Sequence, residues 1–180
     1  MIHLTVARKY ARAFLEIGVK AVNFEILGQE LGTLAGLLEG NRELKAILFS
    51  AVYPAATQKS IVRAVAKPLG LSPATLDFIA LLIDRKRMDH FIEVAKAYEA
   101  LCDEAANRVR AVLITAGEIS PELIKTIKGR LESSTGKEVI LTLKEDPSLM
   151  GGAMTKMGNV VYDGSLRTQL QKIRENLYKE

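Results

Sequence analysis

Cysteine and histidine, the residues that most often act as nucleophiles, proton carriers or metal ligands, are scarce in this sequence. Cys102 is the single cysteine, and His3 and His90 are the two histidines. On one helix, the twelve-residue spacing of His90 and Cys102 would separate them by about 18 Å and about 120° of rotation, so they could not form a catalytic pair. Three such residues do not assemble an ordinary zinc site. We therefore expect Cys102 in the core, His90 at the surface and His3 at a frayed terminus.

Two glycine-containing segments share part of the pattern of a phosphate-binding loop. Thr135-Gly136-Lys137 is similar to the end of a Walker loop, but Gly129 lies six intervening residues upstream instead of four. Glu138 also stands where a magnesium-binding Ser or Thr is needed. Gly151-Gly152 lacks the third glycine of a dinucleotide fingerprint and precedes a predicted strand. We interpret the first segment as a helix end before a strand, and the second as a bend or a close approach of backbone.

Asp163 is a candidate catalytic carboxylate, but the pattern around it favours a turn. Asp163-Gly164 stands directly before Ser165, which can cap a helix. General acid–base chemistry needs a second group, and no carboxylate can be paired with Asp163 from the sequence. The enzyme hypothesis therefore has weak support, and no catalytic residue, cofactor site or metal site is predicted.

The densest basic cluster is Arg85-Lys86-Arg87, in a chain of net charge +4. Cations at a helix C-terminus interact favourably with the helix dipole, which is a sufficient reason for the cluster. A nucleic-acid interface would also require stacking aromatics, whereas Tyr10, Phe14, Phe91 and Tyr98 lie on predicted apolar helix faces. A basic helical adaptor that binds nucleic acid stays open as the alternative function.

The composition is that of a globular protein with an aliphatic core. Of the 180 residues, 48% are hydrophobic, 26% are charged and none is tryptophan. The lone cysteine excludes an intramolecular disulfide and is typical of a reducing compartment. The longest charge-free stretch, residues 46–58, contains Pro54 and polar residues, and it falls short of the ~18 apolar residues that a membrane span needs. We therefore do not expect an integral membrane protein.

Residues 1–106 have the spacing of amphipathic helices throughout. Thr5, Asn23, Ser72 and Asp89 are the expected helix starts, because their side chains can accept hydrogen bonds from the first free N–H groups. The breaks between the predicted helices are short. This part of the chain is predicted to form an all-α six-helix bundle.

Residues 107–180 alternate between strand and helix patterns. Arg108–Thr115 is rich in β-branched residues, and Gly158-Asn159 can form the two-residue turn of a hairpin. Ser120 and Ser165 are expected to cap two helices. The predicted order is β-α-β-β-β-α, a small α+β domain.

Two predicted helices carry apolar side chains that no catalytic or ligand-binding motif explains. The helix that starts at Pro73 carries Phe78–Ile83, which is apolar nearly all round. Such a helix must be enclosed by its own bundle or offer a spare face to a partner helix. The final helix has an apolar stripe at i, i+4, i+7 and i+11, which either packs on its own sheet or meets another chain. The sequence pattern leaves both questions open.

Three segments resemble one family. Asp146–Gly152 and Val161–Leu170 resemble the C-terminal signature of the delta subunit of bacterial F-type ATP synthase, a relative of the mitochondrial oligomycin-sensitivity-conferring protein. Val6–Phe14 is similar to the first helix of that family. The resemblance runs end to end. One departure is Ala153-Met154-Thr155, where bulkier aliphatic residues are usual, and it affects packing.

The resemblance implies a non-catalytic stator without a cofactor, peripheral to the cytoplasmic face of a bacterial inner membrane. Its helical domain, 1–106, would hold the N-terminal helix of an alpha subunit between the first and fifth helices. Its α+β domain, 107–180, would bind the end of the b-type stalk. Neither nucleic acid nor direct membrane insertion is implied, and the lack of a presequence favours a bacterial host. By position, the groove for the alpha subunit would be lined by Tyr10, Ala13, Phe14, Ile79, Leu81 and Leu82. Contacts to the stalk would come from Leu166, Leu170, Ile173 and Leu177.

Overall fold

A mostly helical N-terminal part is followed by a small domain built on a mixed four-stranded sheet, as the sequence predicts. The computed structural model describes residues 2–21, 23–50, 52–158 and 160–177. The chain separates into two compact units, Met1–Cys102 and Asp103–Glu180. The division falls inside the last helix of the N-terminal part, four residues before the boundary at 106/107 that the sequence suggested.

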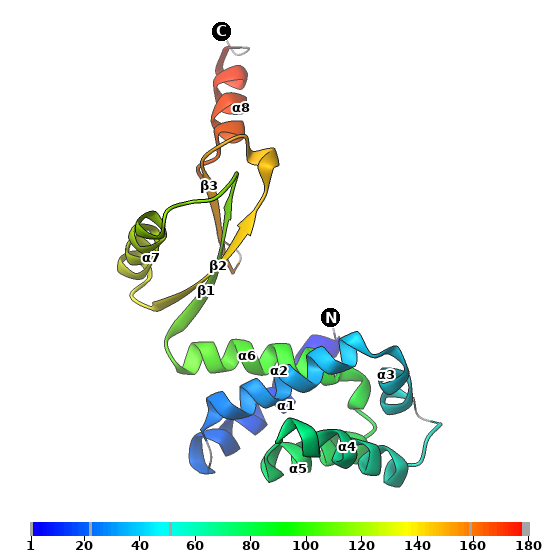
Figure 1. Ribbon diagram of the computed structural model, residues 1–180. Helices are drawn as coiled ribbons and strands as arrows, with labels where there is room; N and C mark the ends of the chain where they lie inside the picture. Colours follow the sequence, from blue (N-terminus) through cyan, green and yellow to red (C-terminus); the bar gives the residue numbers. More distant parts are fainter. Residues whose placement is uncertain (1, 22, 51, 159, 178–180) are drawn as a thin grey trace. The chain divides into compact units, whose positions relative to one another are not determined.

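The N-terminal unit is formed by helices joined by short connections (Figure 1). Its elements in chain order are α1 (Ile2–Ala21), α2 (Phe24–Gly40), α3 (Arg42–Phe49), α4 (Ala55–Leu69), α5 (Pro73–Asp84), the 3-10 turn η1 (Met88–His90) and α6 (Phe91–Ala105). The core between the helices is aliphatic apart from a few aromatic rings. Phe14, Phe78 and Tyr98 are its central aromatic residues, all buried.

Most helix starts follow the local chemistry of the sequence. The side chain of Asn23 accepts a hydrogen bond from the backbone N–H of Glu25, and the hydroxyl of Ser72 accepts one from Thr75. The expected cap at Thr5 is wrong, because α1 already begins at Ile2, which extends the apolar spacing by one turn. The expected cap at Asp89 is also wrong, because this residue lies inside η1, ahead of α6.

Tyr98 ties α6 to the start of α2. Its hydroxyl donates a hydrogen bond to the backbone oxygen of Phe24 over 3.1 Å. The thiol of Cys102 donates to the same oxygen over 3.6 Å, and both side chains are buried. Burial raises the pKa of Tyr98, with a further contribution from Cys102, because the phenolate would lose its hydration. Cys102 is the small core residue that the sequence predicts.

The C-terminal unit combines one sheet with two helices. Its elements are β1 (Arg108–Thr115), α7 (Pro121–Thr135), β2 (Glu138–Glu145), the 3-10 turn η2 (Pro147–Leu149), β3 (Ala153–Met157), β4 (Val160–Asp163) and α8 (Leu166–Leu177). The strand order is β2-β1-β3-β4. β1 is parallel to β2 and antiparallel to β3, and β3 is antiparallel to β4. The expected turn at Gly158-Asn159 lies between β3 and β4, with Asn159 outside the described residues.

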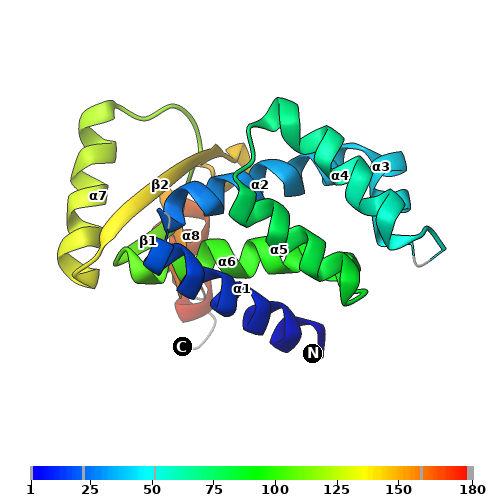
Figure 2. The ribbon, with the colours of Figure 1, turned by 90° about the horizontal axis from the view of Figure 1, so that it is seen from below.

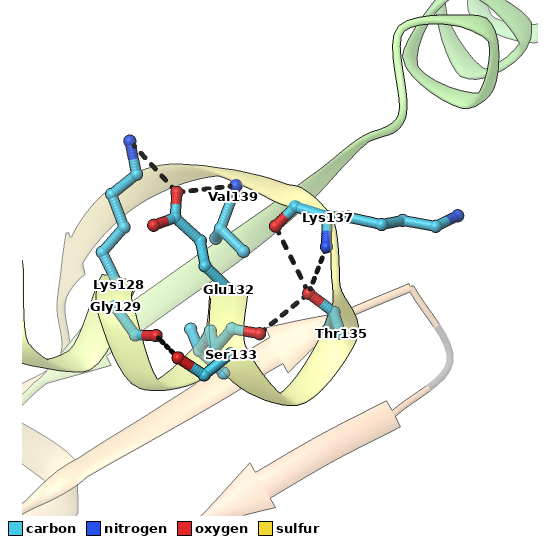
Figure 3. A network of polar contacts seen from close by, with 8 residues as sticks. Lys128, Gly129, Glu132, Ser133, Thr135, Lys137 and Val139 are labelled. Atoms are coloured by element: carbon cyan, nitrogen blue, oxygen red, sulfur yellow. Dashed lines mark hydrogen bonds and ion pairs between the residues drawn. The ribbon is translucent and has the colours of Figure 1, made fainter.

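The Walker-like segment is the C-terminal end of α7 (Figure 3). Gly136 adopts a left-handed conformation with φ 65° and ends the helix. The carboxylate of Glu132 accepts a hydrogen bond from the backbone N–H of Val139 over 3.2 Å, and the Lys128 ammonium lies 3.6 Å from the same oxygen. The side chain of Glu132 therefore joins α7 to the start of β2. The segment is a structural turn, as interpreted from the sequence.

Candidate partner-binding surfaces

In the N-terminal unit, α1 and α5 lie side by side (Figures 1 and 2) and meet through two aromatic rings. The rings of Phe14 and Phe78 stack with centroids 4.1 Å apart and an interplanar angle of 12°. Stacked aromatic rings add a specific attraction to the area that they bury. This contact fixes the two helices against each other at the middle of their length.

Apolar side chains flank this ring contact, and one of them, Tyr10, also packs against the edge of the core. On α1, the buried Ala11 lies on one side of Phe14 by helical rotation, whereas Tyr10 and Ile17 lie on the other side. Tyr10 is half-buried and Ile17 is exposed. On α5, Leu81 lies beside Phe78 in the same way and is 44% exposed. We call the accessible residues the α1–α5 face, which consists of Tyr10, Ala13, Ile17 and Leu81.

The structure divides the six residues predicted to line a groove into two groups. Tyr10, Ala13 and Leu81 are accessible and belong to the α1–α5 face. The expectation for the other three is corrected, because they are buried in the core of their own unit and cannot line an open surface: Phe14, Ile79 and Leu82. Ile17 was missed as a site residue, although it continues the i, i+3, i+4 spacing of Tyr10 and Ala13.

The start of α5 is tied to α2 by a shared carboxylate. Glu30 accepts a hydrogen bond from the hydroxyl of Ser72 over 2.7 Å and another from the hydroxyl of Thr75. Thr75 is fully buried. A carboxylate at this position also faces the positive end of the α5 dipole. Glu30 therefore fixes the end of the helix whose other turns carry Phe78 and Leu81.

The remaining candidates for chemistry take structural places. His90 is buried in η1, so its predicted surface position is wrong, because the 3-10 turn directs it inward before α6 begins. The side chain of His3 lies outside the described residues. Arg85 to Arg87 follow the last turn of α5, and the backbone N–H of Arg87 donates to the Leu82 carbonyl over 2.8 Å. The basic cluster therefore stands at a helix C-terminus, as expected.

In the C-terminal unit, α8 projects from the end of the sheet (Figure 1). Leu166 and Leu170 are 47% and 56% exposed. About half of each residue is therefore accessible, and Leu166 also packs against the loop of its own unit at Gly151. We call these two residues the α8 face. The backbone of Ile173 and Leu177 continues the helix, but their side chains lie outside the described residues.

The edge strand β4 adds apolar surface that the sequence analysis did not single out. Val160, Val161 and Tyr162 are all about half exposed. β4 stands at the edge of the sheet, because β3 is its one neighbour in the strand order. Both faces of the strand therefore present apolar side chains. The alternation of the strand pattern alone gave no signal for this, since it does not show which strand stands at an edge.

Across the part of the chain that the structure describes, no helix is both long enough and apolar enough to span a bilayer. The sequence model of the ATP synthase delta (OSCP) subunit family matches residues 6–177. The chain belongs to this family. It is a delta-type subunit and a component of the peripheral stalk of ATP synthase.

Relatives in this family match over nearly the whole length of both chains. ATP synthase subunit delta of Geobacter metallireducens is 37% identical over 179 residues, which cover 99% of each chain. ATP synthase subunit delta of Syntrophus aciditrophicus is 37% identical over 177 residues, which cover 98% of each. The family assignment agrees with the resemblance seen in the three sequence segments.

A solved structure supports the fold. A chain in the cryo-EM structure of the mitochondrial ATP synthase hexamer of Toxoplasma gondii matches with a TM-score of 0.70, over 96% of this chain and 97% of that chain. The two sequences are 20% identical, so this likeness bears on the fold alone. The partners of a stalk subunit are other subunits of the ATP synthase. The basic cluster that directly follows α5 has a local explanation, because it stands at a helix C-terminus.

Proposed function

We propose that the chain is a non-catalytic stator that links the alpha/beta catalytic head to the b-type stalk. Holding the head still lets the torque of the rotor drive ATP synthesis coupled to proton transport. One observation carries the proposal: each of the two compact units leaves apolar side chains accessible, in the α1–α5 face and in the α8 face. A linker needs two separate attachment surfaces, and these two lie in different units.

The six-helix bundle would attach to the head through the α1–α5 face. An amphipathic helix, such as the N-terminal helix of an alpha subunit, docks with apolar anchors at i, i+3, i+4 and i+7. The small Ala13 leaves room for close approach of a second helix, between the larger Tyr10 and Ile17. Leu81 supplies apolar area on the opposite helix. Tyr10 is the aromatic anchor, because aromatic residues dominate the binding energy of interfaces.

The C-terminal unit would attach to the stalk through the α8 face. Leu166 and Leu170 stand one helical turn apart, which is the spacing with which one helix contacts another. Ile173 and Leu177 continue this stripe by sequence spacing. The exposed edge strand β4 precedes α8 directly and extends the apolar area on the same unit. A helical stalk end can therefore lie along α8.

Apolar burial suits a part that bears load continuously. It stabilises an interface by about 25 cal/mol for each Å² removed from water, without directional geometry. A stable interface of about 1,200–2,000 Å² would be shared between the partners. Such attachment needs neither a nucleotide nor a cofactor in this subunit. The chain would lie at the cytoplasmic face of a bacterial inner membrane, held there through its partner subunits.

A pair of charge substitutions tests the linker function in the full-length chain. Leu81→Glu should weaken binding of a peptide from the alpha N-terminus while binding of a purified b-type stalk end stays unchanged. Leu170→Glu should do the reverse. Isothermal titration calorimetry measures both affinities, and circular dichroism checks that each variant is folded. Each variant is the matched control of the other, because both place one carboxylate on an exposed leucine.

Two results would refute the proposed linker function. If both variants bind both partners as tightly as the wild type, neither face is an attachment surface. If either variant loses both partners while it stays folded, the two faces do not act separately, and the division of labour between the units is wrong.

A further inference from the structure

Two glycine-containing loops cross each other where α8 begins. A Cβ atom on Gly152 would lie 2.4 Å from the backbone oxygen of Gly164, and the φ of Gly152 is 76°. Only a residue without a side chain fits this crossing. The backbone N–H of Gly164 donates to the oxygen of Ala153 over 3.0 Å. The loop before β3 and the loop before α8 are therefore held in contact.

Gly151 makes a second contact with the helix start. Its backbone oxygen accepts a hydrogen bond from the N–H of Leu166 over 3.0 Å. A Cβ atom on Gly151 would lie 2.6 Å from the Cδ1 of Leu166. The missing side chain at Gly151 thus leaves the space that the Leu166 side chain occupies. This contact sets the direction in which Leu166 points.

Asp163, the last residue of β4, accepts hydrogen bonds from the start of α8 with both carboxylate oxygens. Oδ1 accepts from the backbone N–H of Ser165 over 2.9 Å, and Oδ2 accepts from the hydroxyl of Thr168 over 2.8 Å. The Ser165 hydroxyl accepts from the N–H of Thr168 over 3.3 Å, and Ser165 is buried. A carboxylate next to a helix N-terminus is also stabilised by the dipole. The sheet and the helix are thereby joined through one side chain.

Beyond its first turn, α8 lies largely at the surface in the residues whose side chains are described. Its described side chains are exposed, except for the half-buried Thr168. α8 has 12 residues, and isolated helices shorter than about 12–15 residues are marginal in water because the first turn is costly to form. Fixing the first turn removes this cost. Contacts at the first turn can therefore decide whether α8 forms.

We propose that this start is a device that forms and directs α8 before the stalk binds. We call it the α8 anchor, and its members are Gly151, Gly152, Asp163, Gly164, Ser165 and Thr168. The inference rests on the proposed function, in which the stalk binds the α8 face. It adds that Asp163 and Thr168 are positioning residues for stalk attachment. They act through the helix they fix and need no contact with the partner.

The expected effect follows from the fraction of molecules in which α8 is formed. A partner that binds only the formed helix has an apparent Kd equal to its intrinsic Kd divided by that fraction. If loss of the Asp163–Thr168 hydrogen bond leaves the helix formed in about one molecule in ten, the apparent Kd rises about tenfold. Binding energy would then be lost without any change in the contact surface.

Thr168→Val and Thr168→Ser in the full-length chain test this inference. Valine keeps the shape but removes the hydroxyl that donates to Asp163, and serine keeps the hydroxyl. Hydrogen exchange should become faster at the amides of residues 168–171 in Thr168→Val, with the amides of β1 and β3 unchanged. Calorimetry with a purified b-type stalk end should show the affinity loss. Thr168→Ser should keep both the slow exchange and the affinity of the wild type.

Leu170→Glu separates this inference from the proposed function. It should lose the stalk while its exchange pattern stays that of the wild type, because it alters the contact face and leaves the anchor intact. If Leu170→Glu loses the stalk and Thr168→Val binds normally, the anchor inference is overturned and the stalk face stands. If Leu170→Glu binds normally, the proposed stalk face itself fails.

A second variant, at Asp163, shows whether the substitutions affect α8 alone or the whole C-terminal unit. Asp163→Asn keeps one oxygen that can accept from Ser165 and replaces the other by an amide donor. Faster exchange confined to α8, together with weaker binding, supports the inference here too. If both Asp163→Asn and Thr168→Val also speed exchange throughout β1 and β3, these residues hold the fold as a whole, and the positioning role is overturned.

Discussion

Leu81 offers a quantitative test of the α1–α5 face. Burying a leucine side chain completely is worth about 1.5–3 kcal/mol. The bundle already covers part of Leu81 and leaves 44% exposed, so a bound helix that covers the remainder gains about 0.7–1.3 kcal/mol. Since about 1.4 kcal/mol is tenfold in affinity, Leu81→Ala should raise the Kd for the alpha N-terminal peptide about threefold to ninefold.

The assay compares two exposed leucines on different helices. Leu37 on α2 is 37% exposed and stands outside the α1–α5 face, so Leu37→Ala is the matched control. A fluorescently labelled peptide from the alpha N-terminus is titrated with each full-length variant, and anisotropy gives the Kd. Urea unfolding followed by circular dichroism shows whether each variant keeps its stability. Leu37→Ala should bind like the wild type.

Two outcomes would contradict this argument. Equal affinity of Leu81→Ala and the wild type would mean that no partner covers the exposed part of Leu81. An equal loss in Leu37→Ala and Leu81→Ala would mean that the effect comes from the bundle as a whole. In either case the α1–α5 face would not be the surface that receives the alpha subunit.

Other substitutions address stability. Leu82→Ala should lower the free energy of unfolding by about 2–5 kcal/mol in urea titrations, because it empties a core position next to the exposed Leu81. Glu30→Ala should cost about 1–3 kcal/mol in the same assay, since it leaves a buried hydroxyl without its acceptor. Gly152→Ala should lower the melting temperature of the C-terminal unit in calorimetry, because its Cβ would lie 2.4 Å from a backbone oxygen. Burial raises the pKa of Tyr98, so its contribution to stability is present below pH ~10 and is lost as the pH rises further. In urea titrations at increasing alkaline pH, Tyr98→Phe should therefore lose less stability than the wild type.

Features that depend on neighbours in the chain were predictable from the sequence. The cap at Asn23 and the cap at Ser72 follow from a side-chain oxygen next to free backbone N–H groups, and the structure confirms both. Gly151-Gly152 was interpreted as a bend or a close approach of backbone, and the structure shows the close approach, with Gly164 and Leu166 as the neighbours. Each of these features is set by backbone chemistry within a few residues or by glycine itself.

Features that depend on distant packing were not predictable in the same way. Phe14 and Tyr10 share one apolar stripe in the sequence, yet Phe14 is buried and Tyr10 is partly accessible. Ile79 and Leu81 differ in the same way within two residues of α5. Helical spacing gives the direction of each side chain relative to its own helix. It does not give the position of the other helices that decide which side is covered.

The two helices with the most notable apolar patterns show why pattern and burial must be compared. α5 is apolar nearly all round, yet its own bundle covers most of it, and Leu81 is what remains for a partner. α8 is clearly amphipathic, a pattern that predicts a covered stripe without saying whether the sheet or another chain covers it, and Leu166 and Leu170 stay about half exposed. The amount of apolar sequence is therefore a poor guide to the attachment surface. The better guide is apolar surface that the helical pattern predicts to be covered and that the fold leaves open, and by that criterion α8 is the stronger candidate for a partner than α5.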